Sequence, residues 1–186
     1  MKRTIDLLLA LFASLLLALP LLLIALWVKA TSPGPVLYWS DRVGRNNTLF
    51  RMPKFRSMRI DTPEVATHLL QSPEQWLTPI GSFLRRSSLD ELPQLWNILR
   101  GEMSFVGPRP ALHNQHDLIA LRIQAGVHTL RPGLTGWAQI NGRDELPIDK
   151  KVSLDAWYKQ HCSLKLDSRI LTDTVLKVLR RDGISH

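Results

Sequence analysis

A long apolar segment near the N-terminus constrains the fold of this chain more than any other feature of its sequence. From Leu7 to Val28 the chain runs for 22 residues without a charged side chain, and Ser14 is the only polar residue among them. A helix of that length reaches about 33 Å, enough to cross the hydrocarbon core of a bilayer. The segment exceeds the apolar region of a signal peptide, and Lys29 interrupts the small-residue pattern of a cleavage site. We therefore expect a membrane helix that remains in the protein.

Pro20 lies inside this segment and removes one backbone hydrogen bond from the helix. If the helix breaks there, the two pieces reach only about 20 and about 12 Å, and neither crosses the membrane. Basic residues, which favour the cytoplasmic side, flank both ends of the segment: Lys2, Arg3, Lys29, Arg42 and Arg45. A segment bent at Pro20 that enters and leaves one leaflet would satisfy both ends. The residues alone favour an ordinary kinked span, because proline is common in such helices.

The rest of the chain has room for one compact domain, and its charge indicates anionic partners. The 186 residues divide into a membrane helix over residues 1–30 and a domain over residues 31–186. The net charge is +8, which nucleic acid, acidic lipid headgroups and phosphorylated small molecules would each satisfy. Cys162 is the single cysteine, which excludes an intramolecular disulfide, and neither cysteine nor histidine has the spacing of a zinc site.

Hydrophobic patterns after the membrane segment predict an α+β domain that is mainly helical. Val36–Trp39 and Leu49–Phe55 have the composition of a small β-hairpin. A helix is expected after Ser88, ending before Gly101, with an apolar face made of Leu92, Leu95, Trp96 and Leu99. Further helices are expected over residues 113–125, 154–158 and 168–179. The last of these is basic and amphipathic, and it would lie on anionic lipid or pack against the domain.

Two short stretches present cationic side chains in constrained positions. Lys54 and Arg56 alternate along the predicted second strand, which would point both side chains to one face. A solvated strand face is the alternative explanation for this pair. Gly107-Pro-Arg-Pro110 holds Arg109 between two prolines on a stiff turn, which reduces the entropy that the arginine loses when it binds an anion. Such rigidity is seldom needed for solubility alone and favours anion binding.

An acidic pair follows a basic pair at the start of the helix predicted after Ser88. Arg85 and Arg86 come just before Asp90 and Glu91, so that cations and carboxylates meet at one helix end. Ser88 and Glu91 have the spacing of a capping box, and acidic residues in a first turn commonly only complement the helix dipole. Amid several constrained arginines, however, a carboxylate suits a phosphoryl centre, where it holds a divalent metal or attacks phosphorus.

A glycine-rich stretch lies towards the C-terminus. Arg131-Pro-Gly-Leu-Thr-Gly-Trp137, continuing to Asn141-Gly-Arg143, could bring its backbone close to a ligand, with Trp137 and Arg143 available for stacking or phosphate contact. A packed turn around a buried tryptophan is the alternative. The sequence has neither a Walker-type loop nor a G-x-G-x-x-G motif after a strand, so a phosphate site has to be assembled from side chains.

Four motifs in this order resemble one known family. The stretches KFRSM, RRSSLDELPQLWN, GEMSFVGPRP and RPGLTGWAQINGR closely resemble the bacterial sugar transferases called monotopic phosphoglycosyl transferases, over nearly the whole chain. The length resembles the minimal catalytic form of the family, without additional N-terminal spans. The resemblance implies transfer of a sugar phosphate from a UDP-sugar to polyprenyl phosphate, with release of UMP, at the cytoplasmic face of a bacterial inner membrane.

The resemblance also implies roles for individual residues. Asp90 would attack the sugar-linked phosphate and form an aspartyl phosphosugar ester, and Glu91 would assist Mg²⁺ binding at the two carboxylates or proton transfer. The residues that would bind phosphate groups or the nucleotide are Lys54, Arg56, Arg85, Arg86, Arg109 and Arg143. The family further implies a re-entrant helix bent at a Ser-Pro pair, which reverses the preference for a span, although Leu19 stands before Pro20 in place of the serine.

Two rival functions remain open at this point. A membrane-tethered nucleic-acid binder fits the sequence pI of about 10.1 and the six tryptophans, and it predicts salt-dependent binding without any role for Asp90. A scaffold for other glycan enzymes would use the acidic pair only to cap a helix. The resemblance implies no nucleic-acid partner, and the sequence leaves the sugar and the oligomeric state, a homo-oligomer included, undetermined.

Overall fold

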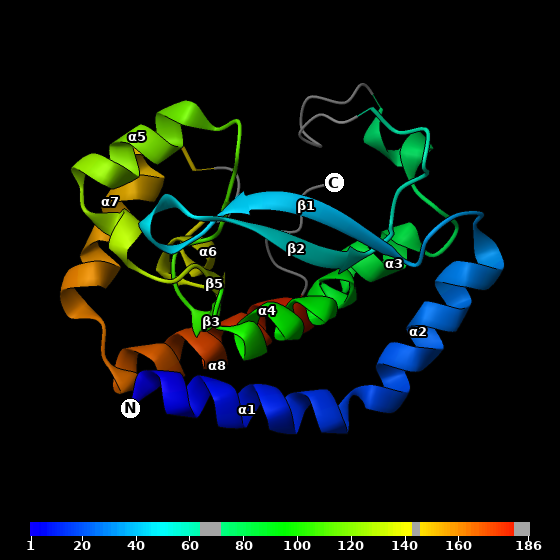
Figure 1. The fold of residues 1–186 in the computed structure, drawn as a ribbon, viewed down its shortest axis with the longest axis horizontal. Coiled ribbons are helices and arrows are strands. Elements are labelled where there is room, and N and C mark those ends of the chain that lie inside the picture. Colours follow the sequence, from blue (N-terminus) through cyan, green and yellow to red (C-terminus); the bar gives the residue numbers. More distant parts are fainter. Residues whose placement is uncertain (64–71, 143–145, 181–186) are drawn as a thin grey trace.

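The computed structural model describes residues 1–63, 72–142 and 146–180 (Figure 1). It begins with two helices, α1 (Lys2–Leu16) and α2 (Ala18–Thr31), which meet at 60° across Leu17. A proline ring in a helix collides with the carbonyl group four residues earlier, and for Pro20 that group belongs to Leu16. The predicted bend is therefore present but begins at Leu17, three residues before Pro20. It leaves helices of 15 and 14 residues.

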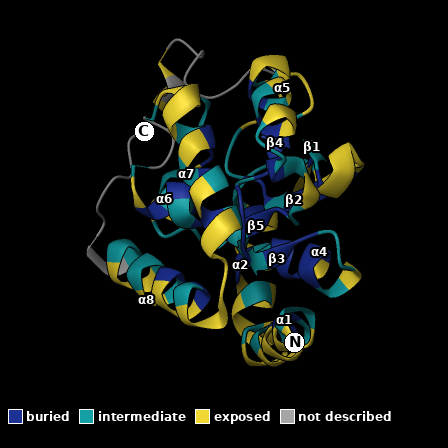
Figure 2. Ribbon diagram, turned by 90° about the vertical axis from the view of Figure 1, so that its left-hand side faces the viewer, coloured by how far each residue is buried: buried dark blue, intermediate teal, exposed yellow. Residues whose placement is uncertain are grey.

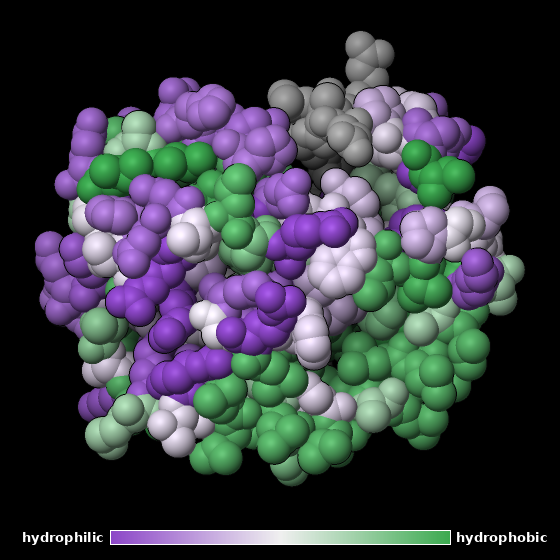
Figure 3. All heavy atoms as spheres, in the orientation of Figure 1, coloured by the Kyte–Doolittle hydropathy of each residue, from purple (hydrophilic) through white to green (hydrophobic). Residues whose placement is uncertain are grey.

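Among the described residues, neither α1 nor α2 alone has the length and apolar character needed to cross a membrane. The two helices meet that requirement by length and composition only when they are taken together across the bend. Several of their large apolar side chains are exposed: Leu8, Phe12, Leu15, Leu19, Leu22 and Leu26. Figure 3 shows hydrophobic surface along the lower and right-hand sides of the molecule, where α1 and α2 run in Figure 1.

Two small sheets lie above this helix pair. The structure has these strands: β1 (Leu37–Val43), β2 (Leu49–Phe55), β3 (Ser104–Val106), β4 (Ala111–Leu112) and β5 (Gly133–Thr135). The first two form the predicted antiparallel hairpin, with Leu37 opposite Phe55, and β4 pairs with β1 as a third strand. β3 and β5 form a separate parallel pair. The hairpin is confirmed, whereas the three shorter strands were not predicted.

Helices make up most of the remaining domain, in agreement with the predicted α+β class. Their bounds are η1 (Arg45–Asn47), η3 (Pro73–Trp76), α3 (Gly81–Arg86), η4 (Leu89–Gln94), α4 (Leu95–Arg100), α5 (His116–Gln124), η5 (Val127–Thr129), α6 (Trp137–Ile140), α7 (Ile148–His161) and α8 (Leu164–Arg180). The helices predicted over 113–125, 154–158 and 168–179 correspond to α5, α7 and α8. α8 buries Ile170 completely and leaves Val175 58% exposed, so part of this amphipathic helix packs against the domain.

The helix predicted after Ser88 divides into two parts. Leu89–Gln94 is a 3₁₀ helix that contains Pro93, and only Leu95–Arg100 is α-helical before Gly101 ends it at a φ of 85°. A 3₁₀ helix turns through three residues instead of 3.6, which rotates the following side chains relative to a continuous α-helix. The predicted apolar face is therefore wrong in part: Trp96 is 53% exposed, and Ile98 is buried in its place.

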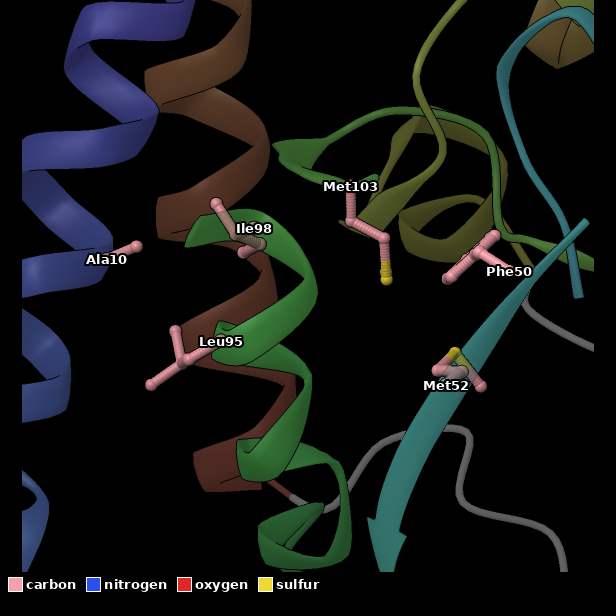
Figure 4. Packing of buried hydrophobic residues seen from close by; sticks show 6 residues of the cluster. All are labelled: Ala10, Phe50, Met52, Leu95, Ile98 and Met103. Carbon is pink, nitrogen blue, oxygen red and sulfur yellow. The ribbon is translucent and has the colours of Figure 1, made fainter. Parts of the chain in front are cut away.

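Side chains from α1, α4 and β2 form a central hydrophobic cluster. Figure 4 shows its members, Ala10, Phe50, Met52, Leu95, Ile98 and Met103, which are all less than a tenth exposed. Figure 2 shows buried residues gathered around α4, β3 and β5, with α1 and α8 outside them. The packing of Ala10 against α4 places the first half of the bent helix pair directly on the domain.

Polar contacts also bind the first turn of α1 to the domain. Lys2 pairs with Asp167 of α8 at 2.5 Å. Arg3 donates to the carbonyl groups of Ile98 and Leu99 at 2.6 and 3.1 Å, where α4 ends. The buried carboxylate of Asp6 accepts from the Ser104 hydroxyl at 2.8 Å and from the backbone N–H of Phe105 at 3.2 Å.

The far end of the bent pair contacts the same domain through apolar side chains. Ile24 and Val28 of α2 pack with Phe55, Ile80 and Leu84. Both ends of the helix pair are thus attached to one folded unit.

Candidate functional site

The acidic pair lies on the 3₁₀ helix η4, immediately after a residue with a left-handed backbone. Ser88 has a φ of 56°, and its carbonyl group accepts from the Glu91 N–H at 3.2 Å. The Ser88 side chain makes no capping hydrogen bond to this helix, so the predicted capping box is wrong. The Glu91 carboxylate instead accepts from Lys54 at 2.7 Å and from Arg109 at 3.3 Å.

Three separate parts of the chain supply this cluster. Lys54 comes from β2, Glu91 from η4, and Arg109 from the Gly107–Pro110 turn between β3 and β4. Asn97 fixes β2 against α4, because its buried amide donates to the Arg51 carbonyl at 2.9 Å. The structure therefore brings together predicted site residues that lie far apart in the sequence.

The two neighbouring carboxyl groups have opposite electrostatic properties. Burial would raise the pKa of Glu91, but the charges of Lys54 and Arg109 and their hydrogen bonds outweigh it and hold that pKa well below its ordinary value. Asp90 is only 8% exposed, and its pKa is raised to about 6, mainly by burial. The charge of Glu91 contributes to this rise, while Lys54, Arg85 and Arg109 oppose it. Glu91 is thus a fixed anion, whereas the buried carboxyl group of Asp90 has a pKa close to neutral pH.

The two arginines of the basic pair differ in position. Arg85 acts electrostatically on Asp90, and its guanidinium lies 3.6 Å from the sulfur of Met58. Arg86 is exposed, and its Nε donates to the carbonyl group of Ser82 on its own helix at 3.4 Å. The structure therefore brings Arg85 to the acidic pair and turns Arg86 to the surface.

Arg56 has partners in another part of the protein. β2 ends at Phe55, although the Arg56 N–H still donates to the carbonyl group of Val36 at 2.9 Å. The buried Arg56 guanidinium donates to the carbonyl groups of Pro33 at 2.6 Å and Ser32 at 2.8 Å, and to the Ser32 hydroxyl at 2.7 Å. These contacts attach the turn after α2 to the hairpin, and among the described hydrogen bonds Arg56 shares no partner with Lys54.

A buried ion pair behind the site was missed by the sequence analysis. Arg122 of α5 donates to the Asp155 carboxylate of α7 at 2.6 and 3.1 Å, and both side chains are nearly inaccessible. Arg122 also donates to the backbone carbonyl of Arg109 at 2.8 Å. The pair therefore holds the turn that carries Arg109. An arginine next to Leu118 on the apolar side of a predicted helix was the available signal, because buried cations need a partner.

The glycine-rich stretch packs against protein backbone. A Cβ atom on Gly133 would lie 2.1 Å from the Gly107 nitrogen, and one on Gly136 would lie 2.0 Å from the Gly107 oxygen. These glycines let β5 approach the start of the Gly107–Pro110 turn, so the packed-turn alternative describes them better than direct contact with a ligand. Trp137 stacks on Trp157 with ring centroids 4.6 Å apart. Arg143 lies outside the described residues.

The carboxylates are suitable donors for the expected Mg²⁺. The described part of the chain has no cluster of three or more acidic, histidine or cysteine side chains that would enclose a metal alone. Mg²⁺ commonly binds one or two carboxylates together with substrate phosphates and water, and Asp90 and Glu91 meet that requirement. A cation here would also offset the desolvation that raises the pKa of Asp90.

Comparison with known proteins shows what this chain is similar to. The family model described as bacterial sugar transferase matches residues 1–181. The chain is 46% identical over 169 residues to a UDP-glucose:undecaprenyl-phosphate glucose-1-phosphate transferase of Xanthomonas campestris pv. campestris, covering 86% of this chain and 35% of that protein. It is 39% identical to an undecaprenyl-phosphate galactose phosphotransferase of Salmonella typhimurium, covering 98% of this chain and 41% of that protein.

A shorter relative matches along almost its whole length. The uncharacterized sugar transferase EpsL of Bacillus subtilis is 41% identical, and the alignment covers 100% of this chain and 91% of that protein. The chain spans about two fifths of the longer relatives that it matches. The family resemblance that the four motifs indicated is thereby confirmed, and this chain belongs to the bacterial sugar transferase family.

Proposed function

We propose that this protein transfers a sugar-1-phosphate from a UDP-sugar to a polyprenyl phosphate, with Asp90 as the nucleophile. The observation that carries the proposal is the placement of buried Asp90 beside Glu91, which Lys54 and Arg109 hold in its ionised form. The names of the relatives, which describe transfer to undecaprenyl phosphate, support the same reaction. Such a transfer is the first membrane step in assembling a polysaccharide or other glycoconjugate.

The first half of the reaction forms an ester on Asp90. A carboxylate oxygen of Asp90 attacks the phosphorus that bears the sugar, and the bond from that phosphorus to the bridging oxygen breaks. UMP leaves with the bridging oxygen and the electron pair. An anionic nucleophile approaches a diphosphate only if cations offset the repulsion, and Lys54, Arg85 and Arg109 supply positive charge around Asp90.

The second half of the reaction restores the enzyme. An oxygen of the polyprenyl phosphate attacks the same phosphorus, the Asp90–phosphorus bond breaks, and the carboxylate leaves. The product is a polyprenyl-diphosphate sugar. Two successive displacements therefore replace a direct attack of polyprenyl phosphate on the UDP-sugar, in which both reactants carry several negative charges. In each displacement the protein holds one charged nucleophile next to the phosphorus.

Glu91 and the expected Mg²⁺ have supporting roles. Bound at Asp90 and Glu91, Mg²⁺ would neutralise the developing charge on the diphosphate oxygens. Lys54 and Arg109 keep Glu91 ionised, and their positive charge favours a phosphate group beside it. Removal of divalent cations by EDTA is expected to abolish UMP release, and added Mg²⁺ should restore it.

The decisive variant is Asp90→Asn, which keeps the shape of the side chain and removes the nucleophile. We expect UMP release from UDP-sugar and undecaprenyl phosphate to fall by at least about a thousandfold, a loss typical of a removed nucleophile. Arg86→Gln serves as a matched control because Arg86 is exposed and bonds only its own helix among the described contacts. Full activity of Asp90→Asn would refute the mechanism, and a wild type that releases no UMP would favour the scaffold function. A panel of UDP-sugars in the same assay identifies the donor.

The bent helix pair is proposed to be re-entrant in the cytoplasmic leaflet. The attachments of Lys2, Arg3 and Asp6 to the domain, together with the packing of Val28, support a chain that enters and leaves the membrane on one side. For the test, Cys162 is replaced by serine, a single cysteine is placed at position 2, and a membrane-impermeant maleimide is added to intact cells. We expect the cysteine at position 2 to remain unlabelled until the membrane is permeabilised. Labelling in intact cells, from the periplasm, would refute the arrangement.

A further inference from the structure

A second group of cationic side chains surrounds a cavity next to the N-terminal end of α1. The cavity has a volume of about 210 Å³, and its lining includes Lys2, Arg3, Arg45 and Arg131. By the same measure one water needs only about 10–15 Å³, so the cavity has ample room for a phosphate group. Its lining contains none of the Lys54, Glu91 and Arg109 side chains, and it is therefore separate from the site around Asp90.

Backbone carbonyl groups hold three of these cations in place. Arg3 donates to Ile98 and Leu99, Arg45 donates to Thr129 at 2.9 Å, and Arg131 donates to Gly101 at 3.0 Å. Each guanidinium has five N–H groups, so these described contacts use only a minority of them. An arginine that is already oriented loses less entropy when it binds an anion.

The carboxylates near the cavity do not match its positive charge. Asp6 is the acidic residue in the lining, and its oxygens accept from Ser104 and Phe105. Asp167 pairs with Lys2 from outside the lining. Burial lowers the pKa of Arg131, and the charges of Arg3 and Arg45 lower it further against the opposite effect of Asp6. Arg3 and Arg45 therefore repel Arg131, and an anion in the cavity would relieve that repulsion.

The position of the cavity suggests where the anion comes from. Lys2 and Arg3 begin the helix whose exposed side chains, among them Leu8 and Phe12, form hydrophobic surface. Figure 1 shows the N-terminus close to the start of α8, where Leu164 is 40% exposed. We propose that this cavity binds a phosphate group at the membrane surface, as the headgroup of an anionic phospholipid or as a soluble phosphate ester. Arginine forks match phosphate oxygens, which makes this class of anion the best fit.

The test compares two probes on the full chain in a nonionic detergent. Dihexanoyl phosphatidylglycerol represents the lipid headgroup, and glycerol 3-phosphate represents the soluble ester. A ligand that binds the native state raises the melting temperature, which yields an apparent affinity. Arg45→Gln removes an exposed cavity cation, Arg45→Lys retains the charge, and Arg169→Gln removes a cation of α8 that is 70% exposed and outside the lining.

The proposal predicts that Arg45→Gln weakens binding about tenfold, that Arg45→Lys recovers most of it, and that Arg169→Gln matches the wild type. If Arg45→Gln loses affinity only for phosphatidylglycerol, the ligand is a lipid headgroup. If it loses equal affinity for both probes, the phosphate ester alone is sufficient for binding. If Arg45→Gln and Arg169→Gln respond alike to both probes, the proposal is overturned. UMP release is measured separately, so this outcome does not depend on the function proposed for Asp90.

Discussion

Among the described residues, the ion pair of Arg122 with Asp155 and the cluster around Asp90 and Glu91 differ in their balance of carboxylates and cations. Asp155 lies opposite Arg122 with two hydrogen bonds, which leaves one cation for one anion. At the other location two adjacent carboxyl groups share the charges of Lys54, Arg85 and Arg109, and Lys54 and Arg109 each donate a hydrogen bond to Glu91. The first arrangement is closed, whereas the second has a second carboxyl group, that of Asp90, available for chemistry.

This difference separates a structural ion pair from the proposed reactive site. Burial raises the pKa of both Asp155 and Asp90, but Asp155 is directly bonded to the cation that opposes this effect. The two arrangements are also connected, because Arg122 donates to the carbonyl group of Arg109. The closed pair therefore positions one of the cations of the open site. If this comparison is right, removing the Asp155 carboxylate should destabilise the fold, and removing the Asp90 carboxylate should stabilise it.

The largest effect on stability is expected from Asp155→Asn. The change leaves the Arg122 guanidinium buried without its anion, which typically costs about 3–5 kcal/mol. For a chain of this size that loss lowers the melting temperature by roughly 10 °C. Differential scanning fluorimetry in detergent measures it. A melting temperature within about one degree of the wild type would mean that the pair is not the structural element described here.

Asp90→Asn is expected to change stability in the opposite direction. The pKa of Asp90 in the folded protein, about 6, lies above its ordinary value of 3.8, so ionisation of Asp90 destabilises the native state. The stability that protonated Asp90 contributes is complete below about pH 4 and is lost as the pH rises through 6. A shift of two units corresponds to up to about 3 kcal/mol.

The measurement for this variant is the melting temperature between pH 4 and pH 8, in EDTA so that no cation stabilises the carboxylate. Asp90→Asn should melt above the wild type at pH 8, and the difference should vanish towards pH 4. A variant that is less stable at every pH would indicate that Asp90 is a structural residue like Asp155.

Substitutions of the arginines are expected to have smaller effects, which concern activity. Arg109→Gln removes a cation that bonds Glu91, and we expect UMP release to fall about a hundredfold, equivalent to about 2.7 kcal/mol. Arg86→Gln should remain within about twofold of the wild type, because Arg86 points to the surface. Equal losses in the two variants would show that the net charge of the surface matters and the position of Arg109 does not.

The sequence predicted the elements of the site better than their contacts. Lys54, Asp90, Glu91 and Arg109 were all identified from residue type and motif, and the structure brings them together. The capping box failed because Ser88 has a left-handed backbone and Glu91 has two cationic partners from distant parts of the chain. Local spacing describes a helix end well, but it contains no information on which side chains a strand and a turn bring to that end.

The error at Trp96 has a local cause. The 3₁₀ turn before Trp96 rotates the helix face. The ion pair of Arg122 and Asp155 joins residues 33 positions apart, so it depends on how α5 packs against α7. The contacts of Lys2 and Arg3 with the domain were also not predicted. From the sequence, these two residues were interpreted only as signals of membrane orientation.

The central claim, that Asp90 forms a covalent ester with the sugar phosphate, is tested most directly by mass spectrometry of the intact protein. The wild type is incubated with its UDP-sugar and Mg²⁺ in the absence of polyprenyl phosphate. We predict a mass increase equal to one sugar phosphate, located on the peptide that contains Asp90, absent from Asp90→Asn and lost when polyprenyl phosphate is added. Rapid turnover with polyprenyl phosphate but no adduct on Asp90 at any time would contradict the account.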